Sequence, residues 1–495
     1  MKEKSMSVNI LAKSMLNILN FILPVLVAPY LARILDPNLY ASYNEATSLL
    51  TWFILFASFG IYNYGLRCIS MYKNNKDKST KLYSSLFMFG IITSTLTLIV
   101  YLIYVLFIRQ TDKILYLVLS LQIVANVFYI EWVNEAVEDY VFILFKTSTL
   151  RIINVVSIFL FVRNANDIVI YALITSLTIL LNNLFSYIHI RKNIKFEMPS
   201  KNDLIHQVKP LTNMFLMANA SMLFTSLDKL MLSFFNTGIE ISYYTFSQQI
   251  LLIITNVLNS ILLASIPRLS NYIGEQKIND YNKLLNQVGN LFLLIAIPVS
   301  IGISVLSTNV MLIYGGENYI MANEVLFIFG IRNILSSLIL LYAQLIIFVN
   351  GHEKYLTKVY IICGISNLIL NIMLLLLKMY NAKYFILTTV IAEIFEFLLE
   401  AYFIKRYIKF VDTKRFKTKQ YIAMCLPFFV IVFLVNRLYP FQTITINFII
   451  NTVVSIIICS LVYACELILT KDEGIYILLN KIKNIILVKI LKRTL

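Results

Sequence analysis

The sequence predicts an all-α, polytopic membrane protein with about fourteen transmembrane helices. Hydrophobic residues make up 59% of the 495 residues and charged residues only 14%, whereas soluble proteins have about 45–50% apolar and about 25% charged residues. Runs of about twenty apolar residues, enough to cross a bilayer as a helix, recur along the whole chain. Because backbone polar groups in lipid must be bonded within their own segment, these runs are predicted to be helices.

The expected spans divide the chain into segments of similar length. They predict two six-helix lobes, 1–192 and 210–406, which a cytoplasmic linker at 193–209 connects. Two additional transmembrane helices follow in 407–470, and 471–495 is predicted to be a basic amphipathic cytoplasmic tail. The spans lie near 8–33, 42–69, 82–108, 113–132, 140–162, 167–190, 210–235, 241–266, 284–306, 320–349, 355–378, 382–404, 420–437 and 443–469.

The distribution of Lys and Arg predicts how the helices are oriented. Most of the 42 basic residues fall in alternate loops, such as "YKNNKDKSTK" and "KRYIKFVDTKRFKTK", and short loops rich in Lys and Arg stay in the cytoplasm. One inner loop, "VNEAVEDY", is acidic and departs from this trend. We therefore expect a multi-pass protein of the cytoplasmic membrane with both termini cytoplasmic. Its net charge of +16 then reflects attraction to anionic membrane lipids rather than to nucleic acid.

The sequence offers little for cofactor chemistry. The five cysteines include no C-x-x-C pair, the three histidines are scattered, and no phosphate-binding G-x-x-x-x-G-K-[ST] loop is present. We therefore expect no cofactor and no metal site. The predicted outer loops are short, whereas a membrane-bound polysaccharide polymerase would need a sizeable loop for its catalytic groups. Transport is favoured over catalysis, and a polymerase remains an alternative.

Polar residues at bilayer depth are the candidate functional residues. A charge there costs at least about 2.5–3.5 kcal/mol, so it usually faces a cavity or a partner. In the first span Asn9, Lys13, Asn17 and Asn20 share one helical face, which is typical of a cavity lining. Hydrogen bonding between packed helices is the alternative interpretation. A second polar stripe in the eighth span consists of Gln249, Asn256 and Asn259.

Basic residues recur at similar depths in the two predicted lobes. Six spans separate Arg33 from Lys229, and six separate Arg67 from Arg268, so the lobes are predicted to be parallel repeats. Asp228 precedes Lys229, and adjacent helix positions point about 100° apart, so each side chain is expected to find a separate partner. The candidate basic positions are Arg33, Arg67, Arg151, Lys229, Arg268 and Arg332.

Three carboxylates share a narrow face of the twelfth span. Glu393, Glu396 and Glu400 follow an i, i+3, i+7 spacing. They could bind a coupling cation, pair with Arg151 or Arg332, or face the inner membrane surface. Pairing with the arginines is the favoured interpretation.

Several segments together resemble a known family. "FILPVLVAPYLARIL", "FGIYNYGLRCIS", "TSLDKLMLSFFNTGIEISYYTFSQQI" and "ILLASIPRLSNYIG" occur in order, and a "GHEK" loop precedes an Asn-x-x-x-Asn helix. This set resembles the Wzx-type flippases of O-antigen and capsular polysaccharide repeat units. Their superfamily also holds the multidrug extrusion (MATE) transporters and the lipid II flippases. The segment "LDPNLYASY" departs from the family, which usually carries glycines after the Leu and the Tyr.

The resemblance implies a MATE-like fold and a substrate. That substrate is an oligosaccharide on undecaprenyl pyrophosphate, moved from the inner to the outer leaflet, and polysaccharide polymerase machinery is a candidate partner. Arginine can bind phosphate oxygens bidentately, so the six basic positions are expected to bind the pyrophosphate. A multidrug exporter coupled to H⁺ or Na⁺ is the alternative within the same fold. The residues expected to face the sugar are Asn17, Asn20, Gln249, Asn256 and Asn259.

Overall fold

A computed structural model describes residues 6–72, 75–192, 194–219, 222, 226–234, 238–472 and 474. Every regular element assigned within these residues is helical. Eleven helical segments among them are long and apolar enough to cross a membrane. The predicted all-α polytopic membrane fold is therefore confirmed, whereas the count of fourteen spans stays a prediction. Most of the predicted tail, 471–495, lies outside the described residues.

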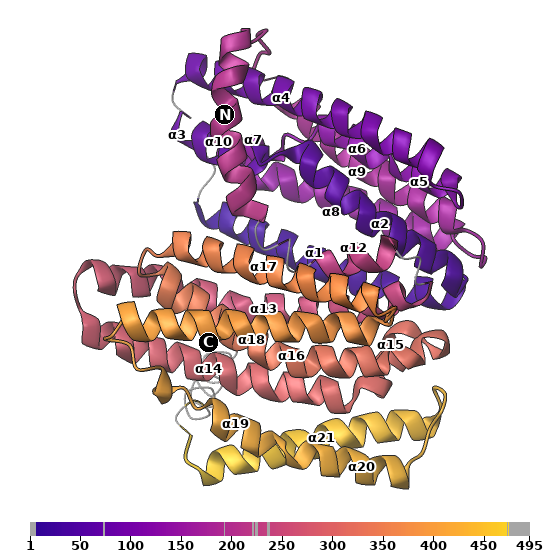
Figure 1. Cartoon of the computed structure of the whole chain (residues 1–495), viewed down its shortest axis with the longest axis vertical. Helices are drawn as coiled ribbons and strands as arrows, with labels where there is room; N and C mark the ends of the chain where they lie inside the picture. The colour runs from indigo at the N-terminus through magenta and orange to yellow at the C-terminus, as the bar shows by residue number, and fades with distance from the viewer. Residues whose placement is uncertain are drawn as a thin grey trace, which may run out of the picture. The chain divides into compact units, whose positions relative to one another are not determined.

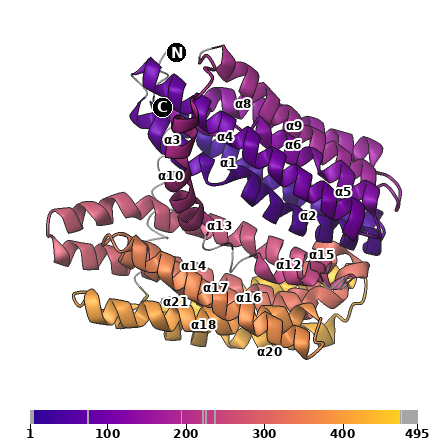
Figure 2. The same cartoon turned by 45° about the horizontal axis from the view of Figure 1, so that its top comes forward.

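The chain divides into two compact units, Met1–Ser242 and Tyr243–Leu495. The predicted lobe and linker boundaries stay predictions. In the first unit, α8 and α9 pack against each other, α9 also packs on α6 and α5, and α1 lies against α8 (Figures 1 and 2). Its elements are α1 (Met6–Ile34), α2 (Pro37–Ser58), α3 (Ile61–Met71), α4 (Lys76–Ile103), the π-helical turn η1 (Tyr104–Ile108), α5 (Lys113–Leu119), α6 (Leu121–Val127), α7 (Glu131–Ala136), α8 (Tyr140–Phe161), α9 (Ile168–Arg191), α10 (Lys201–Asn219) and α12 (Leu227–Phe234).

In the second unit, α14 packs on α16 and α19, α18 packs on α16 and α17, and α20 and α21 form an antiparallel pair (Figure 1). The helix α13 (Glu240–Gly274) begins at the boundary between the units. The other elements are α14 (Ile278–Val305), α15 (Ser307–Gly315), η2 (Glu317–Ala322), α16 (Asn323–Leu341), η3 (Tyr342–Phe348), α17 (Glu353–Leu376), α18 (Ala382–Tyr407), η4 (Thr413–Arg415), α19 (Thr418–Cys425), α20 (Pro427–Leu438) and α21 (Ile446–Leu469).

Local sequence signals fix the ends of α2. Its N-cap Asp36 accepts hydrogen bonds from the backbone N–H groups of Asn38 and Leu39, and proline occupies the first helical turn. The helix ends at Phe59 and Gly60, which are both left-handed. A Cβ on Gly60 would lie 2.8 Å from the backbone nitrogen of Phe215 on α10. The predicted span 42–69 lies in one candidate membrane segment, Pro37–Met71, which consists of α2 and α3. The close approach of α10 leaves no room for a Cβ at position 60.

The predicted span 113–132 lies in one candidate membrane segment, Lys113–Ala136, which consists of the consecutive helices α5, α6 and α7. Ser120 separates α5 from α6, and its hydroxyl bonds back to the carbonyl of Leu117 at 2.6 Å. Such local bonds compete with regular helix geometry. The segment still packs as one layer against α9 and α4.

Close packing between α14 and α16 depends on Gly330. A Cβ at this position would lie 2.1 Å from the Ser304 hydroxyl oxygen and 2.9 Å from the Ser300 carbonyl oxygen. Small residues at membrane helix contacts let the backbones approach closely. Gly330→Val is therefore expected to destabilise the second unit by about 1–3 kcal/mol, the usual cost of overpacking. Thermal unfolding of the purified protein in detergent would measure it.

Gly302 provides the matched control, because it lies on the same helix pair and a Cβ there would meet nothing within 4 Å. Gly302→Val should leave the melting temperature close to the wild-type value. Equal melting temperatures for the two variants would show that the α14–α16 contact does not need a glycine.

Candidate functional site

A pocket of about 320 Å³ lies between α1, α8 and α9 in the first unit. Its apolar wall includes Leu23 and Val27 of α1 and Leu150 and Ile158 of α8. Among the described residues, its polar wall contains one charged side chain, that of Arg151 at the middle of α8. We name this cavity the Arg151 pocket. Its other polar lining residues are Thr147, Asn154, Tyr171, Thr175, Thr178 and Asn182.

The spacing of these residues explains how two helices build one polar surface. On α8, Thr147, Arg151 and Asn154 follow i, i+4, i+7, and on α9 the lining residues 171, 175, 178 and 182 follow i, i+4, i+7, i+11. Both patterns place the side chains on one helical face. The sequence analysis identified Arg151 but missed its neighbours, although this shared periodicity is visible in the sequence.

The connection between α8 and α9 holds the two faces together. The carboxylate of Asp167 accepts hydrogen bonds from the backbone N–H groups of Arg163 and Asn164, at 2.9 and 2.8 Å. These bonds lower the pKa of Asp167, because they stabilise its charged form. The short loop fixes the register of α8 against α9.

Two hydrogen bonds cross from α8 to α9 on either side of Arg151. The Asn154 amide donates to the Thr178 hydroxyl at 2.9 Å, and the Thr147 hydroxyl donates to the Asn182 carbonyl oxygen at 3.3 Å. Arg151 is half-buried between them, and within the described residues no hydrogen bond or ion pair is made by its guanidinium. The pocket therefore presents five N–H donors and a positive charge, flanked by amide and hydroxyl groups.

A second cation on α8 contrasts with Arg151. Lys146 is buried, and its ammonium group lies 2.9 Å from Oε2 of Glu131 on α7. The hydroxyl of Ser186 on α9 completes this network by bonding to both groups. The charge of Lys146 is thus compensated by the protein. The sequence analysis missed this pair, because nothing in the sequence shows that α7 turns Glu131 toward α8.

Three other predicted bases are exposed and make contacts within their own helices. Arg33 donates to the backbone carbonyl four residues earlier, at 2.7 Å. Arg67 lies over the ring of Tyr64, and Arg268 bonds to the hydroxyl of Tyr272 at 3.1 Å. None of the three lines the Arg151 pocket.

Arg332 is engaged by an acidic partner. Its Nη2 lies 2.5 Å from Oε1 of Glu393, whose other oxygen accepts a hydrogen bond from Ser336 at 2.9 Å. The positive charge of Arg332 is therefore balanced by Glu393. Glu396 and Glu400 continue the same face of α18 and are almost fully buried, and neither carboxylate oxygen of Glu400 has a hydrogen-bond partner in the described part of the chain.

The side chains of the predicted polar stripes differ in their surroundings. Gln249 accepts a hydrogen bond from the Tyr314 hydroxyl at 3.0 Å. Asn256 is exposed, and the carbonyl oxygen of Asn259 is buried without a hydrogen bond from the residues described. The side chains of Asn17 and Asn20 lie outside the described structure.

Asp228 and Lys229 lie on the short helix α12, which packs against α2. Asp228 is completely buried, whereas Lys229 is half-buried. Neither residue lines the Arg151 pocket. For metals, the described residues contain no group of three or more His, Cys, Asp or Glu side chains that could hold an ion.

Comparison with known sequences finds one family and two relatives. The family described as "Polysaccharide biosynthesis protein" matches residues 7–273. A protein of Shigella dysenteriae named as an O-antigen transporter is 21% identical over 370 residues, which cover 74% of this chain and 91% of that protein. A protein of Escherichia coli K12 with the same name is 23% identical over 362 residues, which cover 71% and 85%.

Comparison with solved structures shows the same fold in transporters. The lipid II flippase MurJ, in an inward closed conformation, gives a TM-score of 0.69 at 19% identity and covers 94% of this chain and 99% of its own. An inward-facing multidrug resistance MATE family transporter of the MOP superfamily gives a TM-score of 0.59 at 14% identity, covering 79% and 99%. Because the sequence identities are below 20%, these similarities show a shared fold and not a shared function.

Proposed function

Because the chain belongs to the polysaccharide biosynthesis protein family, we propose that it is a flippase for lipid-linked oligosaccharides. The predicted resemblance to polysaccharide repeat-unit flippases is confirmed by the family match and by the two O-antigen transporter relatives. The proposed substrate is an oligosaccharide repeat unit on undecaprenyl pyrophosphate. The protein moves it from the inner to the outer leaflet of the cytoplasmic membrane by alternating access, for the synthesis of O-antigen, capsule or exopolysaccharide.

The Arg151 pocket is the observation that carries this proposal. An arginine inside a membrane helix is costly unless it has a partner, and the described residues supply none for Arg151. The guanidinium fork matches two oxygens of a phosphate. The substrate pyrophosphate is thus a suitable counter-charge, because it arrives and leaves with each transport cycle.

The neighbours of Arg151 suit the sugar part of the substrate. Asn154 and Asn182 each offer an amide that can both donate and accept, and Thr147 and Thr178 offer hydroxyls. Such groups can bond to sugar hydroxyls when the substrate replaces the bonds between α8 and α9. The polar wall therefore binds the first sugars, while the apolar wall on α1 and α8 contacts less polar parts.

The second candidate function is export of cationic compounds coupled to H⁺ or Na⁺. The buried carboxylates of Glu396 and Glu400 favour it, because cationic substrates or coupling ions require acidic groups. The ion pair between Glu393 and Arg332 argues against it, because it shows a carboxylate of the same face of α18 in a structural contact. The two functions predict opposite charge preferences for the substrate.

Reconstitution into vesicles tests the proposed function directly. The purified protein is placed in liposomes that contain a fluorescent undecaprenyl-pyrophosphate-linked oligosaccharide, and a glycosidase that cannot cross the membrane is added outside. Without flipping, the enzyme digests only the outer-leaflet lipid. With the protein, digestion is expected to approach completion, because inner-leaflet lipid is moved outward.

The same vesicles distinguish the two candidates. Digestion confined to the outer leaflet, together with uptake or release of a cationic dye, would reject the flippase and support the exporter. A lipid-linked oligosaccharide on a neutral carrier should not compete with the substrate, because it lacks the phosphate for Arg151.

A further inference from the structure

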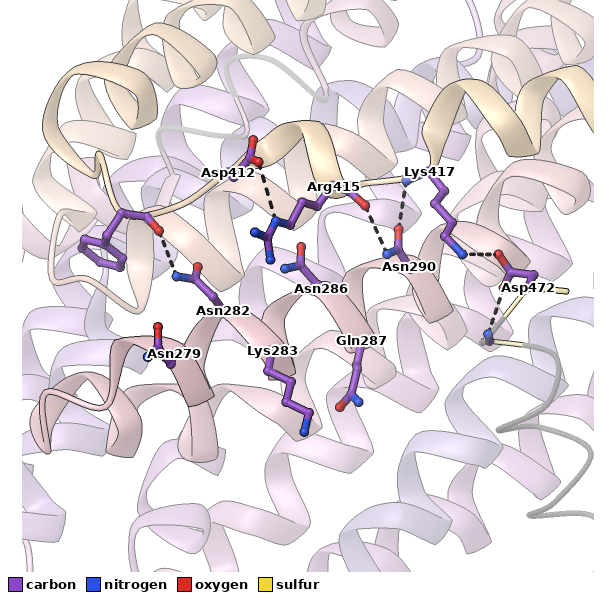
Figure 3. A pocket seen from close by; sticks show the side chains of 12 residues that line it. Asn279, Asn282, Lys283, Asn286, Gln287, Asn290, Asp412, Arg415, Lys417 and Asp472 are labelled. Atoms are coloured by element: carbon purple, nitrogen blue, oxygen red, sulfur yellow. Dashed lines mark hydrogen bonds and ion pairs between the residues drawn. The ribbon is translucent and has the colours of Figure 1, made fainter. Parts of the chain in front are cut away.

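A second pocket, of about 460 Å³, lies in the second unit beside the first turns of α14 (Figure 3). Its opposite wall is the segment 410–417, which connects α18 to α19. Six residues of α14 line it: Asn279, Asn282, Lys283, Asn286, Gln287 and Asn290. Five of these six side chains are amides, so we name this cavity the amide pocket. Nothing in the proposed transport mechanism uses it.

Two amides hold the connecting segment against α14. The Asn282 amide donates to the carbonyl of Phe410 at 2.8 Å. Eight residues further on, Asn290 donates to the carbonyl of Arg415 at 3.3 Å and accepts from the backbone N–H of Lys417 at 2.9 Å (Figure 3). These bonds are about 12 Å apart along the helix. They keep the pocket open between two fixed points.

The polar groups between these points have no partner in the described structure. Asn286 points toward Arg415, while Lys283 and Gln287 extend from the other side of the same helix segment (Figure 3). No hydrogen bond or ion pair of Lys283, Asn286 or Gln287 is formed with described residues. Asn286 is half-buried, so its amide is held at the pocket rather than extended into solvent.

The charges of the pocket leave it positive. Lys417 lies 2.7 Å from the buried carboxylate of Asp472, which neutralises it. Among the described residues, the guanidinium of Arg415 forms one ion pair, a long and exposed contact with Asp412 at 3.6 Å. Lys283 then remains as a cation that no described acidic group balances. The pocket suits a ligand that carries one negative charge.

The length of α14 places the pocket at the level of the lipid headgroups. The helix has 28 residues, which corresponds to about 42 Å, whereas the hydrocarbon core is about 30 Å thick. Its apolar run occupies 291–305, and the amides and Lys283 lie in the preceding turns. The first turns therefore extend past the hydrocarbon, on the side where the loop charges predict the cytoplasm.

We propose that the amide pocket binds a phosphodiester that carries hydroxyl groups, the headgroup of phosphatidylglycerol in the inner leaflet. Lys283 binds the phosphate, whose single negative charge it balances. The amides of Asn286 and Gln287 donate to and accept from the glycerol hydroxyls. A lipid is favoured over a soluble phosphate, because the pocket opens at the headgroup level.

Native mass spectrometry of the purified protein tests the proposal with three probes. Phosphatidylglycerol is expected to bind. Phosphatidylcholine, which has the phosphate but a cationic headgroup without hydroxyls, and soluble glycerol phosphate should bind much more weakly. Lys283→Glu is expected to weaken phosphatidylglycerol binding by at least about tenfold, the usual effect of losing a hydrogen bond to a charged group. Asn286→Ala should also weaken it, to a smaller extent.

Lys354→Glu is the matched control. Lys354 is an exposed lysine near the start of α17, beside another loop predicted to be cytoplasmic. Its replacement by glutamate makes the same change of charge away from the amide pocket. Its phosphatidylglycerol binding should equal that of the wild type. Equal weakening by Lys283→Glu and Lys354→Glu would overturn the proposal, since binding would then follow net charge. Equal affinity for soluble glycerol phosphate would overturn the assignment to a lipid.

Discussion

Replacement of Arg151 by glutamate is expected to abolish flipping in the vesicle assay. The substitution places a carboxylate where the substrate pyrophosphate would lie, and like charges repel strongly in a site of low dielectric constant. Arg151→Gln removes the charge but keeps a polar side chain, so its initial rate should fall about ten- to a hundredfold, the effect of losing a charge-assisted hydrogen bond of about 1.5–3 kcal/mol. Arg151→Lys should retain part of the activity, because charge survives without the bidentate fork.

The control for these variants is Arg163→Glu. Arg163 is exposed in the loop that connects α8 to α9 and does not line the pocket, so its replacement makes the same charge change on the same helical hairpin. Its flipping rate should remain close to wild type. All variants are compared at equal amounts of reconstituted protein. Wild-type rates for both Arg151→Glu and Arg151→Gln would show that Arg151 does not bind the substrate.

Removal of Glu393 is expected to cause the largest loss of folded protein. Glu393→Ala leaves the guanidinium of Arg332 at membrane depth without the carboxylate that now lies 2.5 Å from it. Breaking one side of a buried ion pair costs about 3–5 kcal/mol. The amount of monomeric protein recovered by size-exclusion chromatography in detergent should therefore fall sharply, and the melting temperature of the remainder should decrease.

The exchange Arg332→Glu with Glu393→Arg separates structure from substrate binding. Arg332→Glu alone places two carboxylates together and should abolish both folding and polymer export. The double exchange restores opposite charges, so the abundance of folded protein should recover at least in part. If polymer export also recovers, Arg332 acts as a structural partner of Glu393. Export that stays absent at normal abundance would support the predicted role of Arg332 in binding the pyrophosphate. An exchange that recovers neither would contradict the ion-pair interpretation.

The sequence by itself was enough to predict that this protein lies in a membrane and where most of its helices begin and end. The predicted span 140–162 corresponds to α8 (Tyr140–Phe161), and 167–190 corresponds to α9 (Ile168–Arg191). Such boundaries are predictable because long apolar runs, together with polar or basic ends, reflect the thickness of the bilayer. The sequence also singled out Arg151, since a charge within an apolar run is unusual whatever its partners.

Only the tertiary structure decided which charges remain available to a ligand. Lys146 and Arg151 lie on the same helix, yet Glu131 neutralises the first and no described residue neutralises the second. Arg332 is paired with Glu393, which is 61 positions away. A helix sequence gives the face of each side chain, but its partner depends on which helix packs there and in what register. The same reason explains the need for a glycine at position 60, where α10 approaches too closely for a Cβ.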